Sequence, residues 1–134
     1  MDYALYNDRM KKRILVVDDE KLICWSLEKT FSNEGYEVSV AGSGEQALEM
    51  MKSKNFDVVI ADVKMPGISG LELLTEIKEN SDYLSTEVII MTAFGSPELL
   101  KLAYGKGALD YIEKPLNLSV LKQKVSRVCQ QKIS

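Results

Sequence analysis

An apolar run at residues 58–61 leads directly into a single carboxylate, Asp62, after which proline and glycine break the pattern. A short apolar run between turn residues is typical of a β-strand that is buried on both faces of a parallel sheet. Two more apolar runs, at 14–17 and 88–91, end in a similar way, the first in acidic residues and the second in Thr92. Because the carboxyl ends of parallel strands share one edge of a sheet, these polar side chains are expected to lie together there.

Segments with helical periodicity alternate with strand-like segments along the chain. A clear apolar stripe at helical spacing joins Ile23, Cys24, Leu27 and Phe31. This alternation implies right-handed crossovers and a parallel sheet that is covered by helices on both faces. We therefore expect an α/β protein with a single five-stranded parallel sheet, of the flavodoxin-like (βα)5 type. The expected strands are 13–17, 38–40, 58–62, 88–91 and 109–112, each followed by a helix.

Capping residues mark the starts of two expected helices. Ser43, with Gln46 three residues later, has the sequence of a capping box. Ser96 followed by Pro97 predicts a cap and a proline in the first turn of a helix that ends near Gly105. These helices are therefore expected to begin close to residues 44 and 97.

The chain of 134 residues has the length of one domain. Residues 1–10 show no usable periodicity and are expected to form a flexible N-terminal extension. The domain itself is expected over residues 11–131, with a short C-terminal tail at 132–134. No apolar run approaches the ~20 residues of a membrane-spanning helix, and the first residues lack the order of a secretory signal. We therefore expect no membrane association and a cytoplasmic location.

The composition excludes several kinds of site. The chain contains no histidine, which excludes catalytic centres with a histidine base and metal sites with histidine ligands. Oxygen ligands remain, and these suit a hard cation such as Mg²⁺. Cys24 and Cys129 do not have the spacing of a metal site and are expected to be reduced thiols. The net charge of −3 argues against direct contact with nucleic acid.

The carboxyl edge of the sheet is expected to gather Asp18, Asp19, Asp62, Thr92 and Lys114. Carboxylates about 4 Å apart repel by roughly 4 kcal/mol at an effective dielectric constant near 20, so a cation must offset this repulsion. Mg²⁺ beside a free carboxylate oxygen, a hydroxyl and an ammonium group can neutralise the oxygens of a phosphoryl group during transfer. A carboxylate would then be the nucleophile and would form an acyl phosphate.

Four motifs follow the expected strand ends in order: Val17-Asp18-Asp19-Glu20, Asp62-Val63-Lys64-Met65-Pro66-Gly67, Met91-Thr92-Ala93 and Tyr111-Ile112-Glu113-Lys114-Pro115. Together they closely resemble the receiver domain of bacterial two-component response regulators, over about residues 11–131. The resemblance is greatest to receivers of the nitrogen-regulation type, which usually precede an ATPase and a DNA-binding domain. The sequence leaves open whether this chain is a natural stand-alone receiver or a piece of such a regulator.

The resemblance implies a phosphoacceptor signalling domain and not an enzyme that acts on other molecules. Asp62 would accept a phosphoryl group from a sensor histidine kinase or a histidine phosphotransfer domain. Asp19, Asp62 and the main-chain carbonyl of Lys64 would bind Mg²⁺ directly, and Asp18 would act through a metal-bound water. The domain would catalyse only its own Mg²⁺-dependent phosphorylation and dephosphorylation.

The resemblance also implies a conformational switch. Thr92 and Lys114 would contact the phosphoryl oxygens, and Thr92 would move inward together with Tyr111. The Lys114–Pro115 peptide bond is usually cis in this family. The change would control an output partner or domain in transcription regulation, or it would create a homodimer. The dimer face would be formed by the helix after Pro97, the fifth strand and the last helix.

Simpler roles remain open for several of these residues. Asp18 and Asp19 could cap the first helix, and Glu20 is better explained as a partner of that helix's dipole than as a metal ligand. Thr92 could be an ordinary residue at a strand end, and Tyr111 could contribute packing alone. The side chain of Lys64, two residues after Asp62, is expected to be solvated.

Leu22 and Trp25 lie off the apolar stripe of the first helix. Trp25 could simply cover one edge of that helix. The alternative is a partner contact, because in this family the first helix docks the histidine-containing unit of a kinase beside the acidic site. An exposed aromatic side chain next to such a site is a reasonable anchor.

Two other classes of protein share parts of this pattern. A Mg²⁺-dependent phosphatase with an aspartyl nucleophile carries a second acid two residues later, where this chain has Lys64, and needs a substrate pocket that this chain lacks the residues to build. A flavodoxin-like binding module needs a phosphate-binding loop after the first strand, where the acids at 18–20 would repel a phosphate. A receiver that cannot be phosphorylated is excluded by the intact set of acids.

Overall fold

The structure is a computed structural model that describes residues 11–133, with side chains to residue 130. The extension expected at residues 1–10 lies outside the described residues. The tail expected at 132–134 overlaps the last helix, which is described to Ile133. None of the helices in the described range is long and apolar enough to cross a lipid bilayer.

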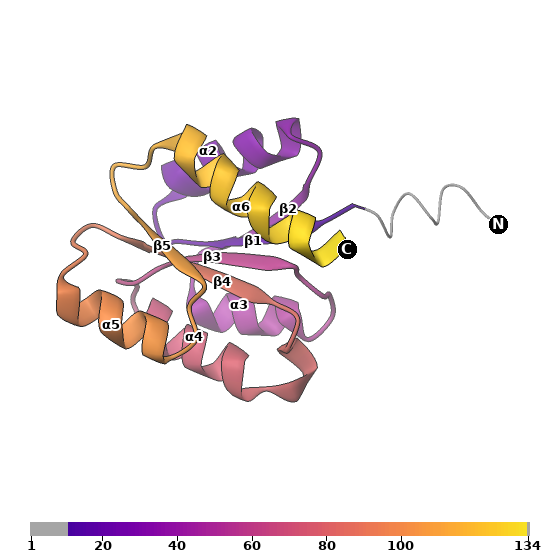
Figure 1. Cartoon of the computed structure of the whole chain (residues 1–134). Helices are drawn as coiled ribbons and strands as arrows, with labels where there is room; N and C mark the ends of the chain where they lie inside the picture. Colours follow the sequence, from indigo (N-terminus) through magenta and orange to yellow (C-terminus); the bar gives the residue numbers. More distant parts are fainter. Residues whose placement is uncertain (1–10, 134) are drawn as a thin grey trace.

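Five parallel strands form one sheet in the order β2-β1-β3-β4-β5 (Figure 1). This arrangement confirms the predicted α/β class and the predicted single parallel sheet. The strand bounds differ from the expected ones by one residue at most. The strands are β1 (Arg13–Val17), β2 (Glu37–Ala41), β3 (Val58–Asp62), β4 (Glu87–Thr92) and β5 (Asp110–Glu113).

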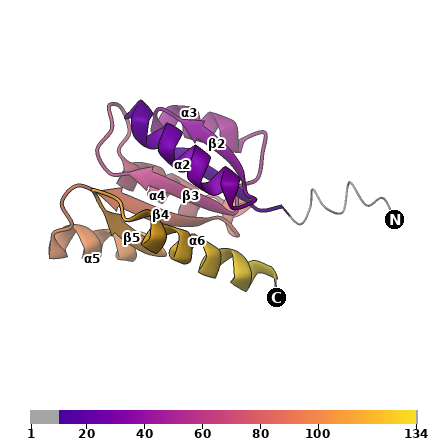
Figure 2. The same ribbon diagram turned by 90° about the horizontal axis from the view of Figure 1, so that it is seen from above.

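Helices cover both faces of the sheet, and Figure 2 shows the same layers from above. One layer holds α2 (Lys21–Asn33) and α6 (Leu118–Ile133), and the other holds α3 (Gly44–Met51), α4 (Gly70–Glu79) and α5 (Pro97–Gly105). Alternate residues of β1 divide between the two layers. Leu15 and Val17 pack in the α3–α5 layer, and Ile14 and Val16 pack in the α2–α6 layer. Burial on both faces explains why the central strands read as continuous apolar runs.

The apolar stripe predicted for the first helix forms the inner face of α2. Cys24, Leu27 and Phe31 are buried there, whereas Ile23 is only half-buried. A short 3-10 helix, η1 (Ser81–Tyr83), follows α4 and has no counterpart in the sequence analysis. The predicted alternation of strands and helices is otherwise the one observed.

The capping box predicted at the start of α3 is only half formed. The Ser43 hydroxyl accepts from the Gln46 N–H at 3.1 Å, as expected. The Gln46 side chain, however, accepts from the N–H of Gly42 at 2.7 Å and not from that of Ser43. The prediction was therefore wrong about the second hydrogen bond, because the Gln46 side-chain oxygen accepts from the residue before the N-cap.

Other helix starts carry the caps that the backbone requires. Ser96 caps α5 by accepting from the N–H of Leu99 at 3.1 Å, with Pro97 at the first helical position as predicted. A reciprocal capping box that the sequence analysis missed begins α4, between Ser69 and Glu72. Both arrangements satisfy backbone donors that have no partner inside their helix.

The start of α4 lies directly against the end of β3. The N–H of Gly70 donates to the carbonyl of Val63 at 2.9 Å. A Cβ atom at position 70 would overlap the carbonyl group of Asp62. Only glycine therefore lets this helix approach the backbone of Asp62 so closely.

We predict that Gly70→Ala lowers the free energy of unfolding by at least about 2 kcal/mol, because the added methyl group meets rigid backbone and not a flexible side chain. Urea denaturation measures the change. The matched control is Gly105→Ala at the end of α5, where a Cβ would have no neighbour within 4 Å. Equal stability of the two variants would show that the close approach does not constrain the fold.

Candidate functional site

The polar residues predicted at the strand ends lie at one edge of the sheet. Asp62 is the last residue of β3, Thr92 is the last of β4, and Asp18 follows β1 directly. All three are buried, although polar side chains are mostly exposed in proteins. Lys114 follows β5 and reaches this group from the edge strand. The parallel register therefore brings four separate segments of the chain together.

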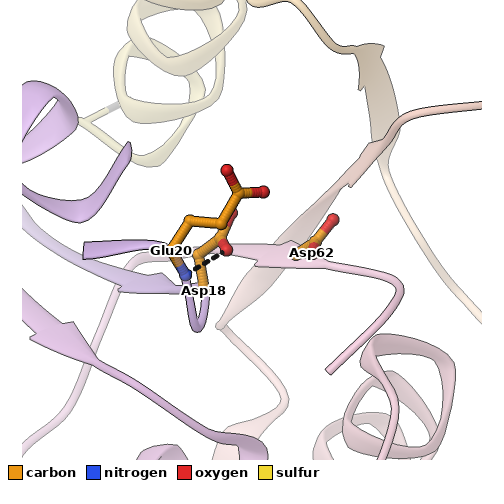
Figure 3. Close-up of side chains that lie close together, drawn as sticks. All are labelled: Asp18, Glu20 and Asp62. Atoms are coloured by element: carbon orange, nitrogen blue, oxygen red, sulfur yellow. Dashed lines mark hydrogen bonds between the residues drawn. The ribbon is translucent and has the colours of Figure 1, made fainter. Parts of the chain in front are cut away.

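Asp18 is fixed by bonds to three neighbouring segments. Its N–H donates to the carbonyl of Ala41 at 3.1 Å, at the end of β2. Its carboxylate accepts from the N–H of Glu20 at 2.9 Å, the dashed line in Figure 3. Its carbonyl accepts from the thiol of Cys24 at 3.2 Å. Asp18 is thus held in place by the backbone as well as by its charge.

The ammonium group of Lys114 contacts three carboxylates. Its Nζ atom lies 2.9 Å from Asp18 Oδ2, 3.0 Å from Glu20 Oε1 and 3.3 Å from Asp62 Oδ1. Burial alone would lower the pKa of Lys114, but the hydrogen bonds to Asp18 and Glu20 and the nearby negative charges raise it above its usual value. The lysine is therefore a permanent cation here. The peptide bond between Lys114 and Pro115 is cis, as the resemblance implied.

Asp18, Glu20 and Asp62 form the acidic cluster of the described residues (Figure 3). One carboxylate oxygen from each lies within 4.8 Å of the others. Burial raises the pKa of Asp62, the negative charge of Asp18 raises it further, and Lys114 opposes both effects. One ammonium group cannot neutralise three carboxylates, and convergent carboxylate oxygens are the ligands that Mg²⁺ prefers. The donor set therefore fits a hard divalent cation.

The membership of this cluster differs from the expected metal ligands at two neighbouring positions. Asp19 is exposed and is not part of the cluster, although its charge contributes to the raised pKa of Asp62. Glu20 was expected to act on the helix dipole, but it precedes α2 and makes no side-chain capping bond. Its longer side chain reaches Lys114 instead. No sequence signal distinguished these two acids.

The loop between β3 and α4, residues 63–69, continues from Asp62 along the same edge. Its first residue is tied to the sheet, because the N–H of Val63 donates to the carbonyl of Met91 at 3.0 Å. Lys64, whose main-chain carbonyl was expected to bind Mg²⁺, follows in this loop with an exposed side chain. The exposure agrees with the solvated side chain that the sequence analysis expected.

Thr92 lies at the site, but its hydroxyl is bonded to the loop that follows β4. The hydroxyl donates to the carbonyl of Phe94 at 3.0 Å and accepts from the N–H of the same residue at 3.1 Å. The Phe94 side chain is 77% exposed. Tyr111 on β5 is half-buried and packs edge-to-face against Tyr104, with ring centroids 6.2 Å apart. Phe94 was missed because nothing in the sequence indicates a backbone partner for Thr92.

Leu22 and Trp25 project from α2 beside the acidic edge. They are 75% and 56% exposed, so neither is part of the core. Leu22 lines a groove of about 290 Å³ together with Lys114 and Leu118. The ammonium group of Lys29 lies 5.4 Å from the centroid of a Trp25 ring, a cation–π distance. The structure thus leaves an apolar surface next to the site.

Comparisons with known proteins agree with this geometry. CrdR of Helicobacter pylori, a transcriptional regulatory protein, is 36% identical over 118 residues, which cover 88% of this chain and 55% of that protein. NtrC of Escherichia coli, a DNA-binding transcriptional regulator, is 39% identical over 105 residues, or 78% of this chain and 22% of that protein. Sporulation initiation phosphotransferase F of Bacillus subtilis is 34% identical over 118 residues, or 88% of this chain and 94% of that protein.

This chain therefore spans about half the length of CrdR and about a fifth of NtrC. Among solved structures, the chemotaxis protein CheY4 of Vibrio cholerae superimposes with a TM-score of 0.84 at 33% identity, covering 88% of this chain and 98% of that one. Residues 14–126 match the family model of the response regulator receiver domain. With the sequence, the fold and the acidic edge in agreement, this chain belongs to the response regulator receiver domain family.

Proposed function

We propose that this chain accepts a phosphoryl group from a histidine kinase, or from a histidine phosphotransfer domain, onto Asp62. One observation carries the proposal: a buried strand-end carboxylate lies 3.3 Å from the ammonium group of the half-buried Lys114, with two further carboxylates around that ammonium group. A carboxylate nucleophile, a fixed cation and an acidic cluster able to hold a metal are the parts that phosphoryl transfer needs. The receiver unit is taken as residues 11–131, after the extension at 1–10.

Asp62 supplies the attacking oxygen. A carboxylate oxygen of Asp62 forms a bond to phosphorus while the bond from phosphorus to the donor's imidazole nitrogen breaks, and the nitrogen keeps the electron pair. Burial raises the pKa of Asp62, and the neighbouring Lys114 opposes that rise, which favours the nucleophilic carboxylate. Lys114 and Thr92 then contact the phosphoryl oxygens.

The acidic edge would hold Mg²⁺ through Asp19, Asp62 and the main-chain carbonyl of Lys64, with Asp18 acting through water. The bound ion supplies positive charge that offsets the charge of the phosphoryl oxygens. Glu20 and Asp18 both pair with Lys114 in this structure and hold its ammonium group near Asp62.

The switch starts at Thr92. To reach a phosphoryl oxygen its hydroxyl must give up both bonds to Phe94, which frees the loop between β4 and α5. Tyr111 on β5 packs against Tyr104 of α5, and it would follow the movement of Thr92. The exposed side chains of α5, Leu102 among them, offer a face for a phosphorylation-dependent homodimer with β5 and α6.

The output belongs to a partner or a further domain that regulates transcription. Two of the relatives above are transcriptional regulators that are much longer than this chain. Phosphotransferase F, in contrast, is almost wholly covered by the alignment. In either arrangement, the proposed phosphorylation of this domain would be read by something else.

We predict that incubation with acetyl phosphate and Mg²⁺ adds one phosphoryl group to the intact protein. Mass spectrometry of the intact chain measures the adduct. The adduct is lost in Asp62→Asn and in the presence of a chelator, because the first removes the nucleophile and the second removes the cation. An adduct that persists in Asp62→Asn would place the acceptor elsewhere and contradict the proposed function.

We predict opposite effects of Lys114→Met on two measurements. Mg²⁺ binds at least about fivefold more tightly, since a positive charge beside the acidic cluster is lost. Phosphorylation by acetyl phosphate slows by at least about tenfold, since the phosphoryl oxygens lose a charged partner. Calorimetry and intact mass measure the two effects, with Lys124→Met, which removes a cation bonded to Asp110 far from the site, as the control. Weaker Mg²⁺ binding in Lys114→Met would contradict the arrangement.

We predict that Trp25→Ala slows transfer from a phosphorylated histidine kinase by about tenfold while the reaction with acetyl phosphate keeps its rate. An exposed aromatic anchor contributes to docking and not to the chemistry. Rapid-quench assays with both donors measure the two rates. The control is Leu84→Ala, a 74% exposed apolar residue that precedes β4 at the opposite edge of the sheet. Equal slowing with both donors would defeat the docking role.

A further inference from the structure

The β3–α4 loop, residues 63–69, follows the proposed phosphoacceptor and carries the carbonyl of Lys64 that is proposed to bind Mg²⁺. Lys64, Pro66 and Gly67 are exposed, whereas Met65 and Ile68 are half-buried and pack against the core. Its two ends are tied down, at one end by the bond from the Val63 N–H to β4 and at the other by the capping box of α4. Between these ends, next to the cap of α4, the backbone of Ile68 has a further contact that comes from another helix.

Glu45 supplies a contact there. This residue lies in the first turn of α3, and its Oε2 atom accepts from the N–H of Ile68 at 3.1 Å. The bond joins residues 23 positions apart, from two different helix–strand units. An acid in a first turn usually serves its own helix dipole. Here the same carboxylate also holds a loop that belongs to the next unit.

The residues around this bond leave room for it. Gly67 has a φ angle of +79°, and a Cβ atom at this position would overlap the Glu45 carboxylate. The Ile68 side chain packs against Gly44, and a Cβ atom at position 44 would overlap that side chain. Two glycines thus let the loop and the start of α3 interlock, through one polar and one apolar contact.

We propose that Glu45 is a positioning residue that fixes the β3–α4 loop and thereby the Lys64 carbonyl. This inference rests on the proposed function, because it assigns the loop a place in Mg²⁺ binding. A hydrogen bond to a carboxylate is shorter and stronger than one between neutral groups, so an exposed loop benefits from it even at the surface. Loss of the bond between Glu45 and the Ile68 N–H increases the mobility of the Lys64 carbonyl. Mg²⁺ binding is then weaker even before any phosphoryl donor is present.

The experiment compares Glu45→Ala, Glu45→Gln and the control Glu49→Ala. Glu49 is an exposed glutamate one turn further along α3, paired only with Lys52 among the described contacts. Calorimetry measures the Mg²⁺ dissociation constant without phosphoryl donor, and amide hydrogen exchange reports on the Ile68 N–H. We expect Glu45→Ala to weaken Mg²⁺ binding by roughly three- to tenfold and to speed exchange at Ile68. Glu45→Gln keeps an acceptor oxygen and loses less, and Glu49→Ala matches the wild type.

Each other outcome has a distinct meaning. Unchanged exchange at Ile68 in Glu45→Ala overturns the contact itself. Faster exchange with Mg²⁺ affinity within twofold of wild type overturns the positioning role, because the loop is then loosened without effect on the metal. Equal weakening in Glu49→Ala also overturns it, since the effect would come from surface charge. A wild-type protein that binds no Mg²⁺ would refute the proposed function together with this inference. The other outcomes appear only in the variants and refute this inference alone.

Discussion

The contact of one lysine with three carboxylates governs this structure's functional edge. Asp18 and Asp62 are buried, and a buried carboxylate costs several kcal/mol unless it is paired. Lys114 provides that pairing from the edge strand, so the position of β5 determines whether the acids can be buried at all. The compensation is incomplete, because one positive charge faces three negative ones. The excess negative charge is what makes this edge suited to a divalent cation.

The fold supplies the geometry that this electrostatic arrangement requires. Parallel strands place their carboxyl ends at one edge of the sheet, and the helices on both faces shield those strands from solvent. The backbone around Asp62 is then fixed from two sides. Val63 continues the bonding to β4, and α4 lies against the Asp62 carbonyl where only Gly70 allows it. Asp62, the proposed phosphoacceptor, is thus carried by backbone with little freedom.

The sequence predicted those features that local patterns express. Buried parallel strands read as apolar runs, and strand ends in one sheet must meet, so the convergence of Asp62 and Lys114 could be predicted. The structure differs where the outcome depends on side-chain reach or on contacts between distant segments. Glu20 joins Asp18 and Asp62 in the acidic cluster because its longer chain reaches the lysine. Gly70 lies against the backbone of Asp62 around a turn, and Glu45 contacts the backbone of Ile68, which is remote in sequence. Neither contact produces a periodic pattern in the sequence.

The two hydrogen bonds between the Thr92 hydroxyl and the Phe94 backbone have a consequence for the unmodified protein. Two ordinary hydrogen bonds contribute about 1–3 kcal/mol together. A gap of that size leaves roughly 1–15% of molecules with the hydroxyl released at any moment, without any modification. In the proposed switch the domain would then have a basal level of output, set by the backbone of one exposed phenylalanine. The ratio of phosphorylated to basal output would then be limited by how often the unmodified protein adopts the active arrangement. It would not be limited by how fully the phosphorylated protein adopts that arrangement.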